Sequence, residues 1–195
     1  MSQAPTTKEL SLEIEVKLAC GDLDRLRNKG LQLTMETARH FEDNWLLDRS
    51  DDSLLAEGAA LRVRSVNGHG TVTYKGVVKE THESRLKVRE EIETAVDEPE
   101  RLIELFERLG YHRSFRYQKY RTGYYTILNG RKLKVLLDET PMGNFIEIEG
   151  DEASVLNALD TAGFAEDDII RESYPELQAS RCRERGAPLE DLTFK

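Results

Sequence analysis

Apolar and polar residues alternate along several segments of the chain, and this alternation predicts β-strands. Between residues 10 and 18, apolar side chains occupy every second position, and Glu13, Glu15 and Lys17 occupy positions between them. A period of two places the two sets on opposite faces of one strand. Strand-like patterns recur in further segments, giving eight predicted strands in all, with the others at 33–48, 60–66, 71–75, 87–94, 116–128, 132–137 and 145–149.

Turn signals separate the predicted strands and favour hairpins between most of them. Residues 50–53 and 67–70 have the composition of turns, and Asn129-Gly130 is a strong two-residue hairpin signal. Helical patterns occupy four remaining segments, near 22–30, 101–109, 152–162 and 173–185. Strands joined mainly by hairpins build an antiparallel sheet, so we predict a single α+β domain over residues 9–195, preceded by a flexible tail at residues 1–8.

The composition is that of a charge-rich globular protein and excludes several classes. The 195 residues include 37 acidic side chains and 28 Lys or Arg side chains, a formal net charge of −9. An acidic chain repels nucleic acids and anionic membranes, so we predict neither as a partner. The chain also lacks an apolar run of transmembrane length and the apolar core of a signal peptide. Because Cys20 and Cys182 show no motif spacing, the sequence indicates a reduced, cytoplasmic protein.

Like charges recur at alternate positions of the predicted strands, and this is the most informative chemical pattern. Glu13 and Glu15 share one strand face, as do Arg62 and Arg64. Two like charges about 7 Å apart along a strand repel each other unless a group of opposite charge binds between them. A divalent cation would satisfy paired carboxylates, and a polyanion would satisfy paired arginines. A sheet with an ordinary solvated face is the alternative.

Eight twisted antiparallel strands can close into a barrel. The apolar faces would then pack outward against the helices, and the charged faces would line the lumen. Such a lumen needs a highly charged ligand, because buried charges are costly without partners. Arginine grips phosphate oxygens with two parallel hydrogen bonds, and carboxylates suit Mg²⁺ or Mn²⁺. The pattern therefore predicts a tunnel that binds a metal-bound polyphosphate.

The segment Glu13-Ile14-Glu15-Val16-Lys17 resembles the ExExK signature of the CYTH superfamily, the triphosphate tunnel metalloenzymes named for class IV adenylyl cyclases and thiamine triphosphatase. Further segments resemble the family in the same order along nearly the whole chain, at 61–64, 73–76, 89–93, 119–121, 137–139 and 145–150. The resemblance implies an eight-stranded, mostly antiparallel, closed β-barrel with flanking helices. One segment departs from the family: Leu46 and Leu47 stand at two positions where members often have aromatic residues, so Leu46 offers no phenol hydroxyl to pair with Lys75.

The resemblance also implies a role for each matching charged residue. The catalytic residues would be Lys17, Glu15 and Glu147. One or two Mg²⁺ or Mn²⁺ ions would be held by Glu13, Glu15, Asp138, Glu147 and Glu149. The triphosphate would be bound by Lys17, Arg62, Arg64, Lys75, Arg89, Lys119, Arg121 and Lys134.

These roles favour a divalent-metal-dependent phosphohydrolase that acts on a triphosphate-bearing small molecule, whether inorganic, nucleoside or thiamine triphosphate. The same site would serve a class IV-type adenylyl cyclase, which converts ATP to cyclic AMP and pyrophosphate. A third hypothesis is a non-catalytic polyphosphate or nucleotide-binding module. The expected partner is in each case a small triphosphate compound, and a homodimer is left open.

Overall fold

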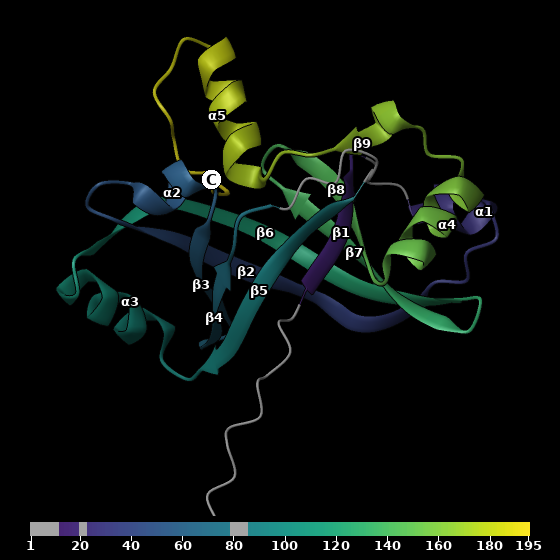
Figure 1. Cartoon of the computed structure of the whole chain (residues 1–195), viewed down its shortest axis with the longest axis horizontal. Coiled ribbons are helices and arrows are strands. Elements are labelled where there is room, and N and C mark those ends of the chain that lie inside the picture. The colour runs from purple at the N-terminus through teal and green to yellow at the C-terminus, as the bar shows by residue number, and fades with distance from the viewer. Residues whose placement is uncertain (1–11, 20–22, 79–85) are drawn as a thin grey trace, which may run out of the picture.

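A closed barrel of antiparallel strands forms the centre of the molecule (Figure 1). The computed structural model describes residues 12–19, 23–78 and 86–195, so the predicted tail at residues 1–8 lies outside the described residues. The strands of the barrel are β1 (Leu12–Leu18), β2 (Thr34–Arg49), β3 (Ala60–Val66), β4 (His69–Lys75), β5 (Lys87–Val96), β6 (Tyr111–Leu128), β7 (Arg131–Thr140) and β8 (Gly143–Glu149).

The first strand closes the barrel. The sheet runs β5-β4-β3-β2-β6-β7-β8-β1, and β1 pairs again with β5. One half of β1 faces β5, with Glu15 opposite Lys87, and its other half faces β8, with Lys17 opposite Glu147. The predicted eight-stranded barrel is therefore confirmed. A short ninth strand, β9 (Ile169–Ile170), extends the sheet beside β1 and was not predicted from the sequence.

Helices surround the barrel. Among the described residues they are α1 (Leu23–Asn28), α2 (Ser53–Glu57), α3 (Pro99–Arg108), α4 (Glu152–Ala162) and α5 (Tyr174–Glu184), with a 3₁₀ turn at Glu166–Asp168. Figure 1 places α5 at one end of the barrel and α4 beside α1 on its flank. In the described part of the chain, no helix combines the length and the apolar character needed to cross a membrane.

A turn forms within the predicted segment 50–53, but helix α2, which begins at Ser53, was not predicted from the sequence. The buried Asp48 carboxylate accepts hydrogen bonds from the backbone N–H groups of Leu54 and Leu55, at 2.9 Å each. These are N–H groups of the first helical turn, which have no partner within the helix. A side chain at the end of β2 thus stabilises a helix that begins five residues later. The composition of the turn segment does not reveal this contact, so it did not predict the helix.

Two apolar clusters lie outside the barrel, as the alternation predicts. One joins the outer faces of β1, β7 and β8 to α1 and α4, and includes Val16, Leu26, Leu133, Ile146 and Leu159. The other joins β2 and β3 to α2 and α3, and includes Leu47, Leu54, Val63 and Ile103. Because the apolar side chains are buried on the outer side, the alternate positions of the same strands point into the lumen.

A third cluster is aromatic and lies at the end of the barrel near α5. Its buried members are Phe115, Tyr117, Phe145, Tyr174 and Leu192. Backbone hydrogen bonds tie the C-terminal segment to β6: the Gln118 N–H donates to the Leu192 oxygen at 2.8 Å, and the Leu192 N–H donates to the Arg116 oxygen at 2.9 Å. The C-terminal segment and α5 therefore pack against this end of the barrel.

Candidate active site

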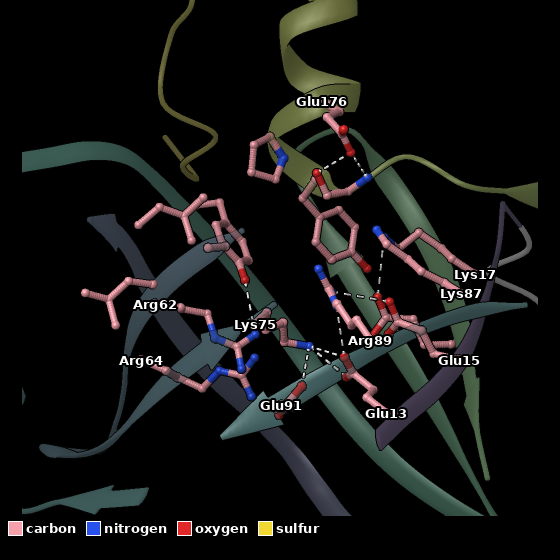
Figure 2. A pocket seen from close by; sticks show the side chains of 18 of the residues that line it. Glu13, Glu15, Lys17, Arg62, Arg64, Lys75, Lys87, Arg89, Glu91 and Glu176 are labelled. Carbon is pink, nitrogen blue, oxygen red and sulfur yellow. Dashed lines mark hydrogen bonds and ion pairs between the residues drawn. The ribbon is translucent and has the colours of Figure 1, made fainter. Parts of the chain in front are cut away.

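The lumen contains a cavity of about 580 Å³, a volume within the usual range for small-molecule sites. Every predicted site residue except Asp138 lines it. The lining residues of that set are Glu13, Glu15, Lys17, Arg62, Arg64, Lys75, Arg89, Lys119, Arg121, Lys134, Glu147 and Glu149. Figure 2 shows the two arginines on one side of the cavity, the carboxylates of Glu13 and Glu15 on the other, and Lys75 between them.

Three carboxylates converge at one part of the cavity. Glu13 and Glu15 share the inner face of β1, and Glu149 lies opposite Glu15 on β8. Each contributes one oxygen to a group whose members all lie within 4.8 Å of one another. Burial, and then the negative charge of the nearby Glu147, raise the pKa of Glu149 above its ordinary value. Clustered oxygen ligands of this kind fit a Mg²⁺ or Mn²⁺ ion.

Basic side chains of the cavity contact the same carboxylates. Lys75 Nζ lies 2.6 Å from a Glu13 oxygen and 2.7 Å from a Glu91 oxygen. Arg89 Nε lies 3.3 Å from Glu13, and Lys134 Nζ lies 3.5 Å from Glu149. The carboxylates and the cations of the lumen are therefore partners of each other in this structure (Figure 2).

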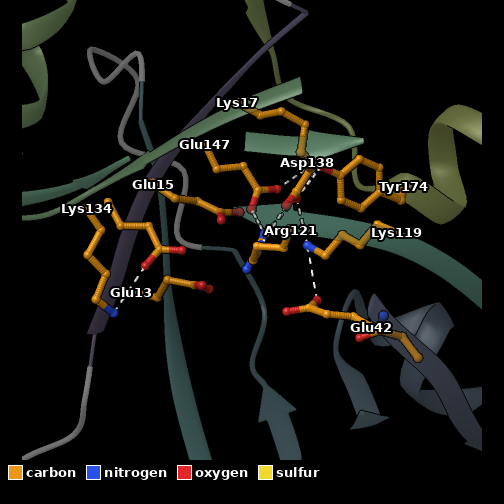
Figure 3. Close-up of polar contacts among 12 residues, drawn as sticks. Glu13, Glu15, Lys17, Glu42, Lys119, Arg121, Lys134, Asp138, Glu147 and Tyr174 are labelled. Carbon is orange, nitrogen blue, oxygen red and sulfur yellow. Dashed lines mark hydrogen bonds and ion pairs between the residues drawn. The ribbon is translucent and has the colours of Figure 1, made fainter. Parts of the chain in front are cut away.

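Asp138 lies behind the cavity wall and is completely buried. Its carboxylate accepts hydrogen bonds from Lys119 Nζ at 2.7 Å, Arg121 Nε at 2.6 Å and the Tyr174 hydroxyl at 2.7 Å (Figure 3). Burial would raise the pKa of Asp138, but Arg121 and Lys119 outweigh it and hold the pKa far below the ordinary range. The structure thus surrounds Asp138 with protein donors, and Asp138 does not line the cavity that the three clustered carboxylates face.

Lys17 extends from β1 toward the N-terminus of α5. Its Nζ donates to the backbone oxygen of Glu172 at 3.0 Å and lies 3.6 Å from a Glu147 oxygen. It also lies 4.3 Å from the centre of the Tyr174 ring. Glu147 makes a second ion pair with Arg121 (Figure 3). The predicted catalytic residues Lys17 and Glu147 are therefore in direct contact. Glu15 lies two residues before Lys17 on β1, on the same face of the strand.

Glu42 is a charged lumen residue that sequence reasoning missed. It is 2% exposed and lies 3.2 Å from Arg64 and 3.6 Å from Lys119. Burial would raise its pKa, but Lys119 and then Arg64 lower the pKa to about 2. One signal was present, because Glu42 and Asn44 alternate along β2 as the charged residues do in other strands. Asn44 accepts a hydrogen bond from Arg64 at 2.9 Å.

Tyr174, also missed, is the first residue of α5 and points into the barrel end. The Ser173 N-cap and Glu176 exchange hydrogen bonds, with the Ser173 N–H donating to Glu176 at 2.6 Å. This capping box fixes the direction in which the chain enters the helix. The helical pattern near 173–185 predicted this helix, but the pattern alone does not indicate that the side chain of Tyr174 contacts Lys17 and Asp138.

Tyr117 is a buried phenol on the cavity wall beside three cations, and this position gives a testable prediction. Arg62 Nη1 donates to its hydroxyl at 3.5 Å. Burial would raise the pKa of Tyr117, but Arg62, Lys119 and Arg64 lower it to about 8. Absorbance titration near 295 nm should therefore detect one tyrosinate forming around pH 8, and Tyr117→Phe should remove it. Tyr120→Phe, at a neighbouring position on β6, should retain it. Identical titrations of the parent and Tyr117→Phe would contradict the prediction.

The closed antiparallel barrel with a lumen of paired carboxylates and cations is the architecture of the triphosphate tunnel proteins. Comparison with known families assigns the chain within that class. The family model of the CYTH domain matches residues 11–174, so the chain belongs to the CYTH domain family. The predicted family is therefore confirmed.

Three relatives illustrate the similarity. A Methanocaldococcus jannaschii protein described as a "putative adenylate cyclase" is 25% identical over 182 residues, covering 86% of this chain and 98% of that protein. A solved Pyrococcus horikoshii structure is 25% identical, with a TM-score of 0.64, and the match covers 87% of this chain and 99% of the other. A Hippeastrum structure, described as a "putative adenylyl cyclase" with a dominant triphosphatase activity, is 19% identical with a TM-score of 0.57, covering 92% and 99%; it supports the shared fold alone.

Proposed function

We propose that this protein is a divalent-metal-dependent phosphohydrolase that acts on a triphosphate-bearing small molecule. The observation that carries the proposal is that one cavity contains both a cluster of three carboxylates and many Lys and Arg side chains. Phosphoryl transfer needs its shifting charge neutralised and its reacting groups held in line. A cavity closed by strands on all sides provides fixed positions for both kinds of group.

Glu13, Glu15 and Glu149 are the residues that would hold Mg²⁺ or Mn²⁺, with Glu147 adjacent to them. A divalent cation bound there supplies positive charge that neutralises phosphate oxygens and favours attack at phosphorus. We assign Asp138 a different role from the one the family resemblance implies: its contacts suit it to fix Lys119 and Arg121 in place. Lys17, in contact with Glu147, would orient the reacting phosphate or the attacking water.

The triphosphate would be bound by the basic residues of the wall. Arg62 and Arg64 come from β3 and Lys75 from β4, while Lys119 and Arg121 come from β6. Arg89 and Lys134 lie nearer the carboxylates. Because the fork of an arginine can donate two parallel hydrogen bonds to one phosphate, the two β3 arginines are suited to fix its orientation as well as its charge.

Arg62→Ala should weaken triphosphate binding without removing the carboxylate cluster. Arg62 lies across the cavity from Glu13 and Glu15 (Figure 2), and a charge-assisted hydrogen bond contributes about 1.5–3 kcal/mol. We therefore expect a roughly 10- to 150-fold weaker affinity for inorganic tripolyphosphate, measured by calorimetry. Arg101→Ala, an exposed residue on α3, serves as the control. An unchanged affinity in Arg62→Ala would remove this residue from the phosphate site.

Product analysis tests the proposal directly. Purified protein is incubated with Mg²⁺ or Mn²⁺ and separately with ATP, inorganic tripolyphosphate and thiamine triphosphate, and products are resolved by phosphorus NMR. Metal-dependent release of orthophosphate from any of the three is the expected result. Tight binding with no product would instead identify a non-catalytic binding module.

The second candidate is an adenylyl cyclase of the class IV type. The description of the Methanocaldococcus jannaschii relative favours it. In that reaction the ribose hydroxyl attacks the first phosphorus of ATP, so cyclic AMP and pyrophosphate would appear in the same experiment and would overturn the hydrolase proposal.

A further inference from the structure

The cavity has two chemically different parts. Glu13 and Glu15 lie on the side opposite Arg62 and Arg64 (Figure 2). Arg62 itself donates to the hydroxyls of Thr73 and Tyr117, but on its β2 side part of the wall is apolar. Leu46 is the cross-strand partner of Arg62 on β2, and Phe115 of β6 is in turn the partner of Leu46. Both side chains line the cavity, so an apolar surface adjoins the arginine side and lies away from the carboxylates.

The lining of the cavity also includes two exposed apolar side chains, which we call the apolar rim. Leu55 of α2 is 71% exposed and Leu189 of the C-terminal segment is 54% exposed, and both line the cavity. Large exposed apolar side chains at a cavity indicate a binding surface, because covering them with an apolar ligand removes them from water and is favourable. Separate large apolar side chains on a surface are common, but these two border the same cavity as Leu46 and Phe115.

Both rim residues stand on anchored backbone. The N–H groups of Leu54 and Leu55 donate to the Asp48 carboxylate, which holds α2 against the barrel. The C-terminal segment is held by the paired backbone hydrogen bonds of Leu192 to β6. The apolar rim is therefore preformed, and a ligand that uses it does not have to order it first.

We propose that this apolar wall and rim form a subsite for the organic group of a triphosphate ester, in particular an uncharged aromatic ring system such as a nucleobase. The substrate would then lie with its esterified phosphate at Arg62 and its terminal phosphate at Glu13, Glu15 and Glu149. This inference rests on the proposed function, because it assumes that the cations between the two parts bind a triphosphate.

The ligand chemistry follows from what the subsite offers. Inorganic tripolyphosphate has no apolar surface and would gain nothing from Leu46, Leu55 or Leu189. A cationic ring would need an available carboxylate. Asp48 of β2 already accepts three backbone hydrogen bonds, from Arg49, Leu54 and Leu55. Glu176 of α5, which also lines the cavity, already accepts hydrogen bonds from the N–H and the hydroxyl of Ser173. An uncharged ring fits this surface best.

The orientation also selects the bond that breaks. With the terminal phosphate beside the carboxylates, the oxygen of water bonds to the terminal phosphorus. The bond from that phosphorus to its bridging oxygen breaks, and the bridging oxygen leaves on the diphosphate. The proton released by the water passes to solvent. ATP would therefore yield ADP and orthophosphate.

The test uses a double variant of the rim, Leu55→Asn with Leu189→Asn. Asparagine is similar in size and uncharged, so it removes apolar surface without repelling phosphate. Because both positions are exposed, the substitutions should not disturb the packing of the hydrophobic core. Dissociation constants are measured by calorimetry without metal for β,γ-imido-ATP and for inorganic tripolyphosphate. We expect at least tenfold weaker binding of the ATP analogue and less than a twofold change for tripolyphosphate. Leu105→Asn, 54% exposed on α3, should leave both constants unchanged.

The outcomes separate the subsite from the proposed function. The subsite proposal is wrong if the double variant binds the ATP analogue as tightly as the parent, or if its affinity for both probes falls by the same factor. In either case the proposed phosphate site is not contradicted. Release of AMP and pyrophosphate from ATP by the parent would overturn the orientation. If the parent binds neither probe, with or without Mg²⁺, the proposed function fails and the subsite fails with it.

Discussion

Glu15→Gln is expected to abolish metal-dependent turnover while leaving the fold intact. Glu15 belongs to the group of three carboxylates and lies opposite Glu149 on the neighbouring strand. Glutamine keeps the shape but removes the charge that a divalent cation needs, so we expect turnover with Mg²⁺ or Mn²⁺ to fall by roughly a hundredfold or more. Removal of one of several crowded negative charges also relieves repulsion, so the unfolding midpoint should stay within a few degrees of the parent.

The matched control is Glu90→Gln, which makes the same chemical change on β5 between Arg89 and Glu91 but at a position that does not line the cavity. Glu90→Gln should retain parental activity. A rise in the Mg²⁺ concentration needed for half-maximal activity in Glu15→Gln would locate the defect in metal binding. Full metal-dependent activity in Glu15→Gln would show that the carboxylate cluster is not the metal site.

Asp138→Ala should cause the largest loss of stability among single changes in the lumen. The substitution removes the fully buried counter-ion that Lys119 and Arg121 share. Of the ion pairs in the described part of the chain, Lys119 then keeps only the longer contact with Glu42, and Arg121 keeps only its pair with Glu147. Breaking a buried ion pair by removing one partner costs about 3–5 kcal/mol. We expect a decrease of that size in the free energy of unfolding, measured by urea denaturation. Glu139→Gln, the next residue on β7, breaks only the half-exposed pair with Arg39 and should cost less than about 1 kcal/mol.

The more conservative Asp138→Asn separates the two roles considered for this carboxylate. If Asp138 fixes the two cations, Asn should lower stability substantially and weaken tripolyphosphate binding even without metal. If Asp138 is instead a metal ligand, Asn should preserve the stability of the metal-free protein and raise only the Mg²⁺ requirement. The second result would overturn our assignment and restore the role that the family resemblance implies.

Alternation along the chain was sufficient to predict the strands, because most of them carry apolar residues on one face and charged residues on the other. The closed eight-stranded barrel was what the family resemblance implied. The pattern is strong in β1, where Ile14 and Val16 alternate with Glu13, Glu15 and Lys17. Alternation cannot predict β9, because a strand of two residues is too short to show a period. It also does not predict α2, whose first turn depends on the Asp48 carboxylate.

The charged face of each strand was predictable, but the partners across the lumen were not. The sequence places Lys134 and Asp138 on one strand face, yet Lys134 reaches the cavity and Asp138 lies buried behind Lys119 and Arg121. That difference depends on Tyr174, which covers Asp138 from a helix 36 residues later in the chain. Contacts between distant elements can be predicted only when the register between the strands of the barrel is known, and local sequence patterns do not determine that register.

The pairing of Glu13 with Lys75 and Arg89 has a consequence for how the protein loads its ligands. A cation arriving alone must compete with these side chains for the Glu13 oxygens, and a polyanion arriving alone must draw the same side chains away from Glu13. When both arrive, the carboxylate exchanges its ammonium and guanidinium partners for the metal, and those partners turn to the phosphates. Metal and polyanion should therefore strengthen each other's binding by an equal factor, as reciprocal linkage requires. The lumen therefore acts as an internal salt, in which the carboxylates and the basic side chains exchange each other for the metal and the phosphates when substrate binds.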